Sequence, residues 1–300
     1  MPYDAIVIGG SFAGLSGAMM LARARRPVLV IDAGAPRNRF AAHAHGVLAL
    51  DGRPGSEILA DARAQLAAYP TVAMLRGEAA SASGRDGAFR VRTKEGAEFL
   101  GRKLLLATGV VDVLPEVPGL AERWGKSVLH CPYCHGYEVG GGGPIGVLSN
   151  APTAVQYASL IADWGEVTLF TNGPHEFPDG EKAMLRRRGV RVEPGRVERL
   201  EGQGTELDGI RLGDGRVVPV RALFVPPALE VASPVARELG CALEDTPAGR
   251  LLRTDAEKMT TVPGVYAAGD ATLARSNITL AAADGVRAGI GLHHALVAEG

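Results

Sequence analysis

The N-terminal stretch up to Asp32 constrains the fold of this 300-residue chain more than any other. A short apolar run, Tyr3–Ile8, predicts a buried strand, and a glycine-rich turn follows it. An amphipathic helix is then expected to about Arg25, because Pro27 ends it. A second apolar run leads directly to Asp32. Strand, glycine turn, helix, strand and acid in this order form the unit that binds dinucleotides.

The glycine turn has the sequence Gly9-Gly10-Ser11-Phe12-Ala13-Gly14, with Ser11 where the G-x-G-x-x-G pattern has its middle glycine. Glycines let backbone N–H groups approach a pyrophosphate at a helix N-terminus, and the acid binds a ribose hydroxyl. Asp32 alone would also suit an ordinary turn after a strand, but its distance from Gly9 favours the ribose role. Dinucleotide contacts are therefore predicted at Gly9, Ser11, Phe12, Ala13, Gly14 and Asp32.

Composition excludes several classes of protein. A length of 300 residues indicates about two domains. The net charge of −1 provides no basic field that would attract nucleic acid or a membrane surface. The uncharged stretch 5–22 follows Asp4 and has the spacing of a phosphate loop, so we expect neither a signal peptide nor a membrane helix. Three cysteines form no disulfide scaffold, which fits a cytoplasmic location.

A second feature is Cys131-Pro132-Tyr133-Cys134-His135, in which two residues separate two cysteines. Beside dinucleotide-binding patterns, this spacing predicts a redox pair. A zinc knuckle and a chance pair are the alternatives; zinc needs about four ligands, and Cys241 is the one cysteine left. We predict no metal site. His135 is the adjacent residue whose unperturbed pKa suits a general base, with a structural hydrogen bond as its alternative. Cys131, Cys134 and His135 are the predicted catalytic residues.

The segment after the cysteines predicts a second strand–helix–strand unit, with strands at 144–148 and 166–170 and a helix at 153–163. Its turn, from Ser149 to Ala154, contains no glycine, and Pro152 lacks a donor. The residues after the next strand include no arginine pair for a 2′-phosphate and no acid for a 2′-hydroxyl. This unit is expected to be a nicotinamide-type domain that has lost its ligand.

The C-terminal part predicts a return to the first domain. Gly264–Asp270 resembles a strand that runs into a tight turn with an acid, and a helix is expected at 277–296. Alone, Gly269-Asp270 would be an ordinary turn. The predicted fold is α/β, with two Rossmann-like three-layer domains: a dinucleotide-binding domain split between residues 1–114 and 227–300, and an inserted domain, 115–226, that carries the cysteine pair. Arg37 and Asn38 are candidates for phosphate or adenosine contacts, and His45 is a weaker one.

Four motifs together carry a family resemblance: Gly9–Gly14, Ala107-Thr108-Gly109, the cysteine pair and Gly264–Asp270. Their order resembles that of the low-molecular-weight thioredoxin reductases, over nearly the whole chain. The resemblance implies an FAD-dependent homodimer in which Cys134 faces the flavin and Cys131 exchanges with substrate. It also implies FAD contacts at Ala79, Ala107, Thr108, Gly109, Gly269, Asp270, Asn277 and Ile278.

Two departures from that family point to a branch of it. The glycine turn and arginines for NADPH are missing, and His135 stands where ordinary members carry an acid. This combination resembles the dithiol oxidases of gliotoxin and holomycin biosynthesis. The resemblance implies a natural-product dithiol as substrate, dioxygen as acceptor and peroxide as product. The alternatives are a disulfide reductase for a thioredoxin-like protein, fed by weakly bound NADPH or another donor, and a non-catalytic flavin redox sensor.

Overall fold

The structure is a computed structural model that describes residues 2–299, and the chain divides into two compact units. The first unit comprises the described parts of Met1–Arg39, Arg53–Asp112 and Leu229–Gly300, and the second comprises Phe40–Gly52 and Val113–Ala228. The sequence-based boundaries assign loop 40–52 to the first domain, whereas here it groups with the second unit. One reason is close packing: a Cβ at Gly125 would lie 2.4 Å from that of Phe40.

The first unit is built on a seven-stranded sheet with the strand order β3-β2-β1-β6-β5-β4, and β19 pairs with β6. The strands at its centre are parallel and buried on both faces, as continuous apolar runs require, while β4 and β5 form an antiparallel hairpin ribbon with β6. The strand bounds are β1 Tyr3–Ile8, β2 Val28–Asp32, β3 Val72–Arg76, β4 Ala79–Arg85, β5 Ala88–Thr93, β6 Glu98–Leu106 and β19 Val265–Ala267.

The register of this sheet brings distant motifs together. Ile8 pairs with both Ile31 and Leu106, and Leu106 also pairs with Ala267. The glycine turn, Asp32, Ala107 and the turn after β19 therefore all leave the same carboxyl edge, where ligands of open α/β sheets bind. The fold class predicted from the sequence is confirmed by this unit, by the parallel sheet of the second unit and by the solved structures described below.

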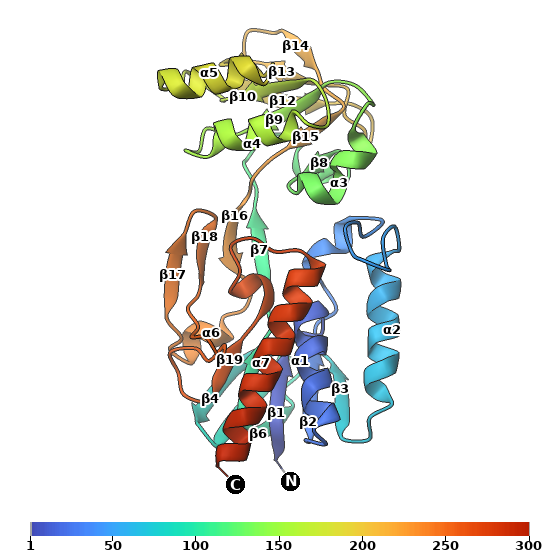
Figure 1. The fold of residues 1–300 in the computed structure, drawn as a ribbon, viewed down its shortest axis with the longest axis vertical. Helices are drawn as coiled ribbons and strands as arrows, with labels where there is room; N and C mark the ends of the chain where they lie inside the picture. The colour runs from blue at the N-terminus through green and yellow to red at the C-terminus, as the bar shows by residue number, and fades with distance from the viewer. Residues whose placement is uncertain (1, 300) are drawn as a thin grey trace. The chain divides into compact units, whose positions relative to one another are not determined.

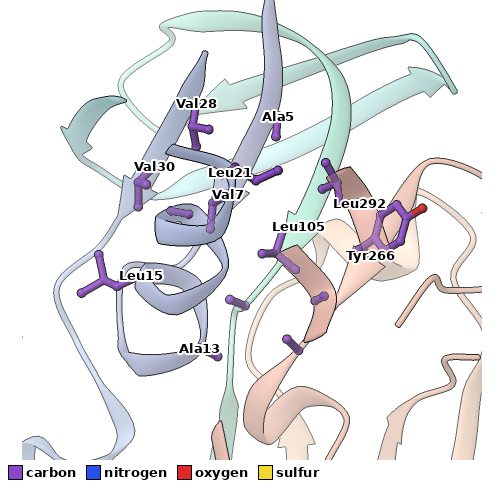
Figure 2. Packing of buried hydrophobic residues seen from close by; sticks show 14 of the residues in the cluster. Ala5, Val7, Ala13, Leu15, Leu21, Val28, Val30, Leu105, Tyr266 and Leu292 are labelled. Atoms are coloured by element: carbon purple, nitrogen blue, oxygen red, sulfur yellow. The ribbon is translucent and has the colours of Figure 1, made fainter. Parts of the chain in front are cut away.

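Helices α1 (Phe12–Arg23) and α7 (Ile278–Ala298) lie side by side against this sheet (Figure 1). Gly285 allows the two helices to approach closely, because a Cβ at this position would lie 2.0 Å from the Ala13 carbonyl oxygen. Figure 2 shows the core between them and the sheet, with Leu21, Leu105 and Leu292 among its side chains. Helix α1 ends earlier than predicted because Arg25 has a left-handed φ of +58°. Helices α2 (Gly55–Ala67) and α6 (Val235–Glu238) complete the unit.

A four-stranded sheet, of order β17-β18-β16-β7, was not anticipated. Its strands are β7 Val110–Val113, β16 Ala228–Val231, β17 Leu243–Thr246 and β18 Gly249–Leu252. The prolines of the stretch 111–119 are typical of a linker, but the beginning of this stretch pairs as β7. β7 pairs with β16, which lies more than a hundred residues further along the chain, and a pairing over this separation gives no local signal in the sequence.

The second unit has a parallel sheet of order β11-β10-β9-β15-β8 and a three-stranded antiparallel sheet. The strands are β8 Val128–Leu129, β9 Ile145–Leu148, β10 Val167–Phe170, β11 Arg191–Glu193, β12 Val197–Glu201, β13 Gly209–Leu212, β14 Val217–Pro219 and β15 Ala222–Phe224. The helices are α3 Pro132–Val139, α4 Ala154–Ile161 and α5 Asp179–Arg187, and η2 Ala121–Arg123 is a short 3-10 turn. Two further 3-10 turns occur outside this unit: η1 Arg37–Phe40 begins in the first unit, and η3 Gly269–Ala271 lies in it. Within residues 2–299, none of the helices has the length and apolar character needed to cross a membrane.

Candidate functional site

The glycine turn after β1 is shaped by close backbone contacts. Gly9 has a φ of +108°, and a Cβ there would lie 2.2 Å from the Ala107 carbonyl oxygen. A Cβ at Gly14 would lie 1.8 Å from the Gly9 carbonyl oxygen, so only glycine fits at either position. Ser11 is the N-cap of α1 and makes no side-chain cap hydrogen bond. The first N–H groups of a helix have no intrahelical acceptor, which makes this turn suitable for a pyrophosphate.

Asp32 lies directly beside that turn. Its Oδ1 accepts a hydrogen bond from the Gly34 N–H at 2.9 Å, and its Oδ2 accepts one from Arg63 at 3.0 Å. Arg63 also donates to the Gly10 carbonyl at 3.2 Å. Asp32 therefore makes the hydrogen bond expected of an ordinary turn residue after a strand. It also lies next to the glycines, where a residue that binds a ribose hydroxyl is expected. Sequence reasoning missed Arg63 because α2 contains no motif that would mark its single arginine as a partner of Asp32.

The Thr108 hydroxyl is the group of the first unit that best indicates a bound ligand. Its Oγ1 is buried and has no hydrogen-bond partner among the described residues. The buried hydroxyls of Thr71 and Thr93 in this unit also lack a partner, but Thr108 differs from them because it lies at the carboxyl edge of the sheet, where a ligand would bind. The next residue, Gly109, has a φ of +69°, and a Cβ there would meet no atom within 4 Å. The N–H groups at the start of α1, the Asp32 carboxylate and the Thr108 hydroxyl therefore together fit a bound dinucleotide.

Arg37 connects three segments at the same edge. It donates to both carboxylate oxygens of Asp112, through Nε at 3.0 and 3.1 Å, and to Asp270 through Nη1 at 3.0 Å. Burial alone lowers the pKa of Arg37, but the hydrogen bonds and charges of the two carboxylates outweigh burial, and its pKa is raised. This arginine is fully engaged by protein groups, so its predicted phosphate contact stays a prediction.

The other predicted FAD contacts are dispersed through the fold. Ala79 is buried at the start of β4, in the core that also contains Ile6. Asn277 is the N-cap of α7, where its Oδ1 accepts from the Leu280 N–H at 2.8 Å, and Ile278 is the first residue of that helix. The Asn38 amide lies against Gly55 at the start of α2. None of these positions is tested by a bound group, and their roles stay predictions.

The redox pair begins helix α3 in the second unit. Cys131 is its N-cap, Pro132 occupies the first turn, and Cys131 and Cys134 form a disulfide with a Cα–Cα distance of 5.2 Å. The helix packs closely on Trp164, because a Cβ at Gly136 would lie 2.7 Å from the indole ring. Among residues 2–299, the remaining cysteine, Cys241, is buried in the first unit and within hydrogen-bond distance of Thr260.

Aromatic side chains on the same helix are strongly exposed within this unit. Tyr137 has an exposed fraction of 88%, and Tyr133 has one of 71% although its ring meets Trp164 edge-on. Tyr137 therefore does not pack as a core residue of the second unit.

His135 is surrounded by titratable groups from α3 and from loop 40–52. Desolvation lowers the pKa of His135 below its ordinary value, the Glu138 carboxylate opposes this, and the neighbouring His45 adds to it. The His45 ring lies 3.5 Å from a Glu138 oxygen and 3.7 Å from an Asp51 oxygen. The imidazole of His135 is therefore neutral at neutral pH and able to accept a proton. His45, predicted as a cofactor contact, belongs to this cluster in the second unit.

The turn after β9 uses its polar groups internally. Ser149 Oγ accepts from the Ala151 N–H at 3.3 Å, and the Ala151 carbonyl accepts from the Ala154 N–H at 2.9 Å. After β10, Asn172 Oδ1 accepts from the Val197 N–H at 2.8 Å. The turn after β9 thus lacks the glycine expected for binding a pyrophosphate, and the turn after β10 lacks the arginine pair expected for a 2′-phosphate.

A dinucleotide-type unit with a glycine turn, joined in one chain to a unit that carries a disulfide on a helix, defines a flavin-dependent disulfide oxidoreductase. The protein belongs to the pyridine nucleotide-disulphide oxidoreductase family, which it matches over residues 3–300. Its cofactor is FAD, as in the thioredoxin reductases that it resembles. The resemblance stated from the four motifs is thereby confirmed, and the protein is an enzyme of disulfide chemistry.

Known proteins resemble it over nearly their whole length. It is 31% identical to thioredoxin reductase sirT of Leptosphaeria maculans, over 97% of this chain and 93% of that protein. It is 34% identical to thioredoxin reductase tcpT of Claviceps purpurea, over 95% and 92%. Among solved structures, an oxidoreductase from Agrobacterium tumefaciens has a TM-score of 0.95 at 43% identity and full coverage of both chains. The structure of HlmI has a TM-score of 0.90 at 39% identity, covering 99% and 93%.

Proposed function

We propose that the protein oxidises a small-molecule dithiol to a disulfide through Cys131 and Cys134, with dioxygen as final electron acceptor and peroxide as product. The observation that carries the proposal is the turn after β9, where internal hydrogen bonds and Pro152 occupy the place of a glycine phosphate loop. Because this turn offers a nicotinamide no pyrophosphate cradle, electrons are proposed to enter as thiols. The likeness to enzymes named thioredoxin reductase sirT and tcpT, and to HlmI, supports the same choice.

The proposed exchange balances with the pair alone. A substrate thiolate attacks Cys131 Sγ, which forms a mixed disulfide and breaks the Cys131–Cys134 bond. The second substrate thiol, once deprotonated, attacks the substrate sulfur of that mixed disulfide. This step forms the disulfide of the product and releases Cys131 as a thiolate. Cys131 and Cys134 are then reduced, and the substrate has lost two electrons and two protons. Bound FAD supplies the two-electron chemistry that restores the disulfide at the expense of dioxygen.

His135 is proposed to accept the substrate thiol proton. A free thiol with a pKa of about 8.5 is only a few per cent ionised at neutral pH, so a base speeds the attack. The lowered pKa of His135 keeps its imidazole neutral and ready for this role. Replacement by alanine is expected to slow thiol exchange by about 10²-fold with FAD still bound. Rapid mixing of the oxidised enzyme with dithiol measures this, and an unchanged rate would leave His135 a structural role.

Two neighbours of His135 are expected to shift its pKa in opposite directions. Glu138 raises this pKa, so Glu138→Gln should lower it and move the acid limb of the pH–rate profile to lower pH. His45 lowers it, so His45→Gln should move the same limb to higher pH. The two variants serve as controls for each other, because damage to α3 would slow both without opposite shifts. Shifts in the same direction would contradict the assignment of this limb to His135.

Anaerobic reduction of the flavin separates the proposal from its main alternative. The oxidised protein is mixed without oxygen with dithiothreitol in one cell and with NADPH in another, and the visible flavin absorbance is followed. Rapid bleaching by the dithiol and little by NADPH is expected. Rapid bleaching by NADPH would instead make the protein a reductase of a thioredoxin-like protein. No bleaching by any dithiol would favour a redox sensor. The homodimer and the cytoplasmic location stay predictions.

A further inference from the structure

Lys258 and Asp284 form a buried ion pair in the first unit. Lys258 Nζ lies 3.0 Å from Asp284 Oδ2, and the two side chains are only 6% and 4% exposed. Taking two charges out of water is costly, so a buried pair is weak evidence for a role in stability alone. What the pair contacts is therefore more informative than its existence.

Both charges act on the turn η3, which follows β19. Asp284 Oδ2 accepts hydrogen bonds from the Gly269 N–H at 3.0 Å and from Thr272 Oγ1 at 2.9 Å. Lys258 Nζ donates to the same Thr272 hydroxyl at 3.1 Å. The two ends of the turn are thus fixed to one carboxylate on α7, and the ammonium neutralises that carboxylate.

This turn presents a predicted cofactor-binding group. Gly269 has a φ of +77°, and a Cβ there would lie 2.8 Å from that of Ala13 in the first turn of α1. The next carboxylate, Asp270, is held by Arg37 at 3.0 Å and by Ser276 Oγ at 2.5 Å. A small rotation of the turn would move both Asp270 and the backbone that faces the glycine turn.

The backbone of Lys258 is also unusual. Its φ of +68° is a left-handed conformation that side chains other than glycine rarely adopt. Its N–H donates to the Asp255 carbonyl, and its carbonyl accepts from the Ala267 N–H at the end of β19. Such conformations persist where the surrounding structure determines them and are concentrated at functional sites. Here the conformation directs an ammonium at the base of the turn.

We propose that Lys258 and Asp284 are positioning residues for the FAD-binding turn Gly269–Asp270. They hold the turn in its binding conformation before the cofactor arrives, so the pair sets FAD affinity in addition to its effect on the stability of the apo-protein. The proposal uses FAD as cofactor and does not depend on the thiol substrate.

The test measures FAD affinity and apo-protein stability separately. Apo-protein is titrated with FAD, flavin fluorescence gives the dissociation constant, and thermal unfolding of the apo-protein gives its midpoint. Lys258→Met and Asp284→Asn are each expected to weaken FAD binding about tenfold or more, equivalent to about 1.4 kcal/mol per tenfold. Thr272→Val keeps both charges and removes the hydroxyl that they share, and it is expected to weaken binding by about threefold or more.

Lys103→Met is the matched control. Lys103 is also a buried lysine of the first unit, paired with Asp86 and Glu299, and it does not contact the turn. It is expected to lower the unfolding midpoint and to leave the FAD dissociation constant within about twofold. If Lys258→Met or Asp284→Asn does not fold, Thr272→Val decides alone. Variants that lower the midpoint like Lys103→Met but bind FAD as tightly as the parent protein would overturn the proposal.

Discussion

Serine in place of either Cys131 or Cys134 is expected to abolish dithiol oxidation, a fall of about 10³-fold or more, because a hydroxyl cannot form the exchangeable sulfur bond. FAD should stay bound, since both cysteines lie in the second unit and the predicted cofactor turns lie in the first. Oxygen consumption with a dithiol measures the loss, and the visible spectrum of the purified variant measures flavin content. Normal turnover by either variant would remove the pair from the chemistry.

Cys241→Ser is the matched control for that experiment. Cys241 is buried, burial raises the pKa of its thiol, and its sulfur lies 3.5 Å from the Thr260 hydroxyl. A neutral buried thiol of this kind behaves as a small apolar side chain. Turnover should therefore remain close to that of the parent protein. A loss equal to that of the Cys131 variant would show that serine at any cysteine harms the fold, and the pair would need another probe.

Replacing Arg37 with methionine is expected to lower the free energy of unfolding of the apo-protein by about 3 kcal/mol, because the carboxylates of Asp112 and Asp270 would lose their partner. The side chains of the three residues are 19%, 8% and 20% exposed, so water would compensate the two acids only in part. Urea unfolding of the apo-protein gives the change from the shift of the midpoint.

Arg90→Met provides the comparison for Arg37. Arg90 pairs with Glu98, but the two side chains are 55% and 45% exposed. Exposed ion pairs contribute about 0–1 kcal/mol, so little change is expected. Equal losses in the two variants would deny the Arg37 bridge any special role. An Arg37 variant with unchanged stability and much weaker FAD binding would instead favour the phosphate contact predicted from the sequence.

Much of the cofactor-binding half of the site was predictable because its signals are local. The glycine turn, the helix start and Asp32 all follow β1 within one strand–helix–strand unit, and their spacing is set by backbone geometry. The redox pair is likewise contained in one turn of α3. The missing glycine after β9 could be recognised for the same reason, since it departs from a short pattern.

The local units and the chemistry that they carry could be predicted from the sequence, because glycine conformations, apolar runs and thiol spacing act within a few residues. Which distant side chains meet became known from the fold. Arg37 lies between Asp112 and Asp270, His45 lies beside Glu138 of α3, and Lys258 pairs with Asp284 next to the turn after β19. These pairs depend on strand register and helix packing, which bring together residues whose separation along the chain contains no signal.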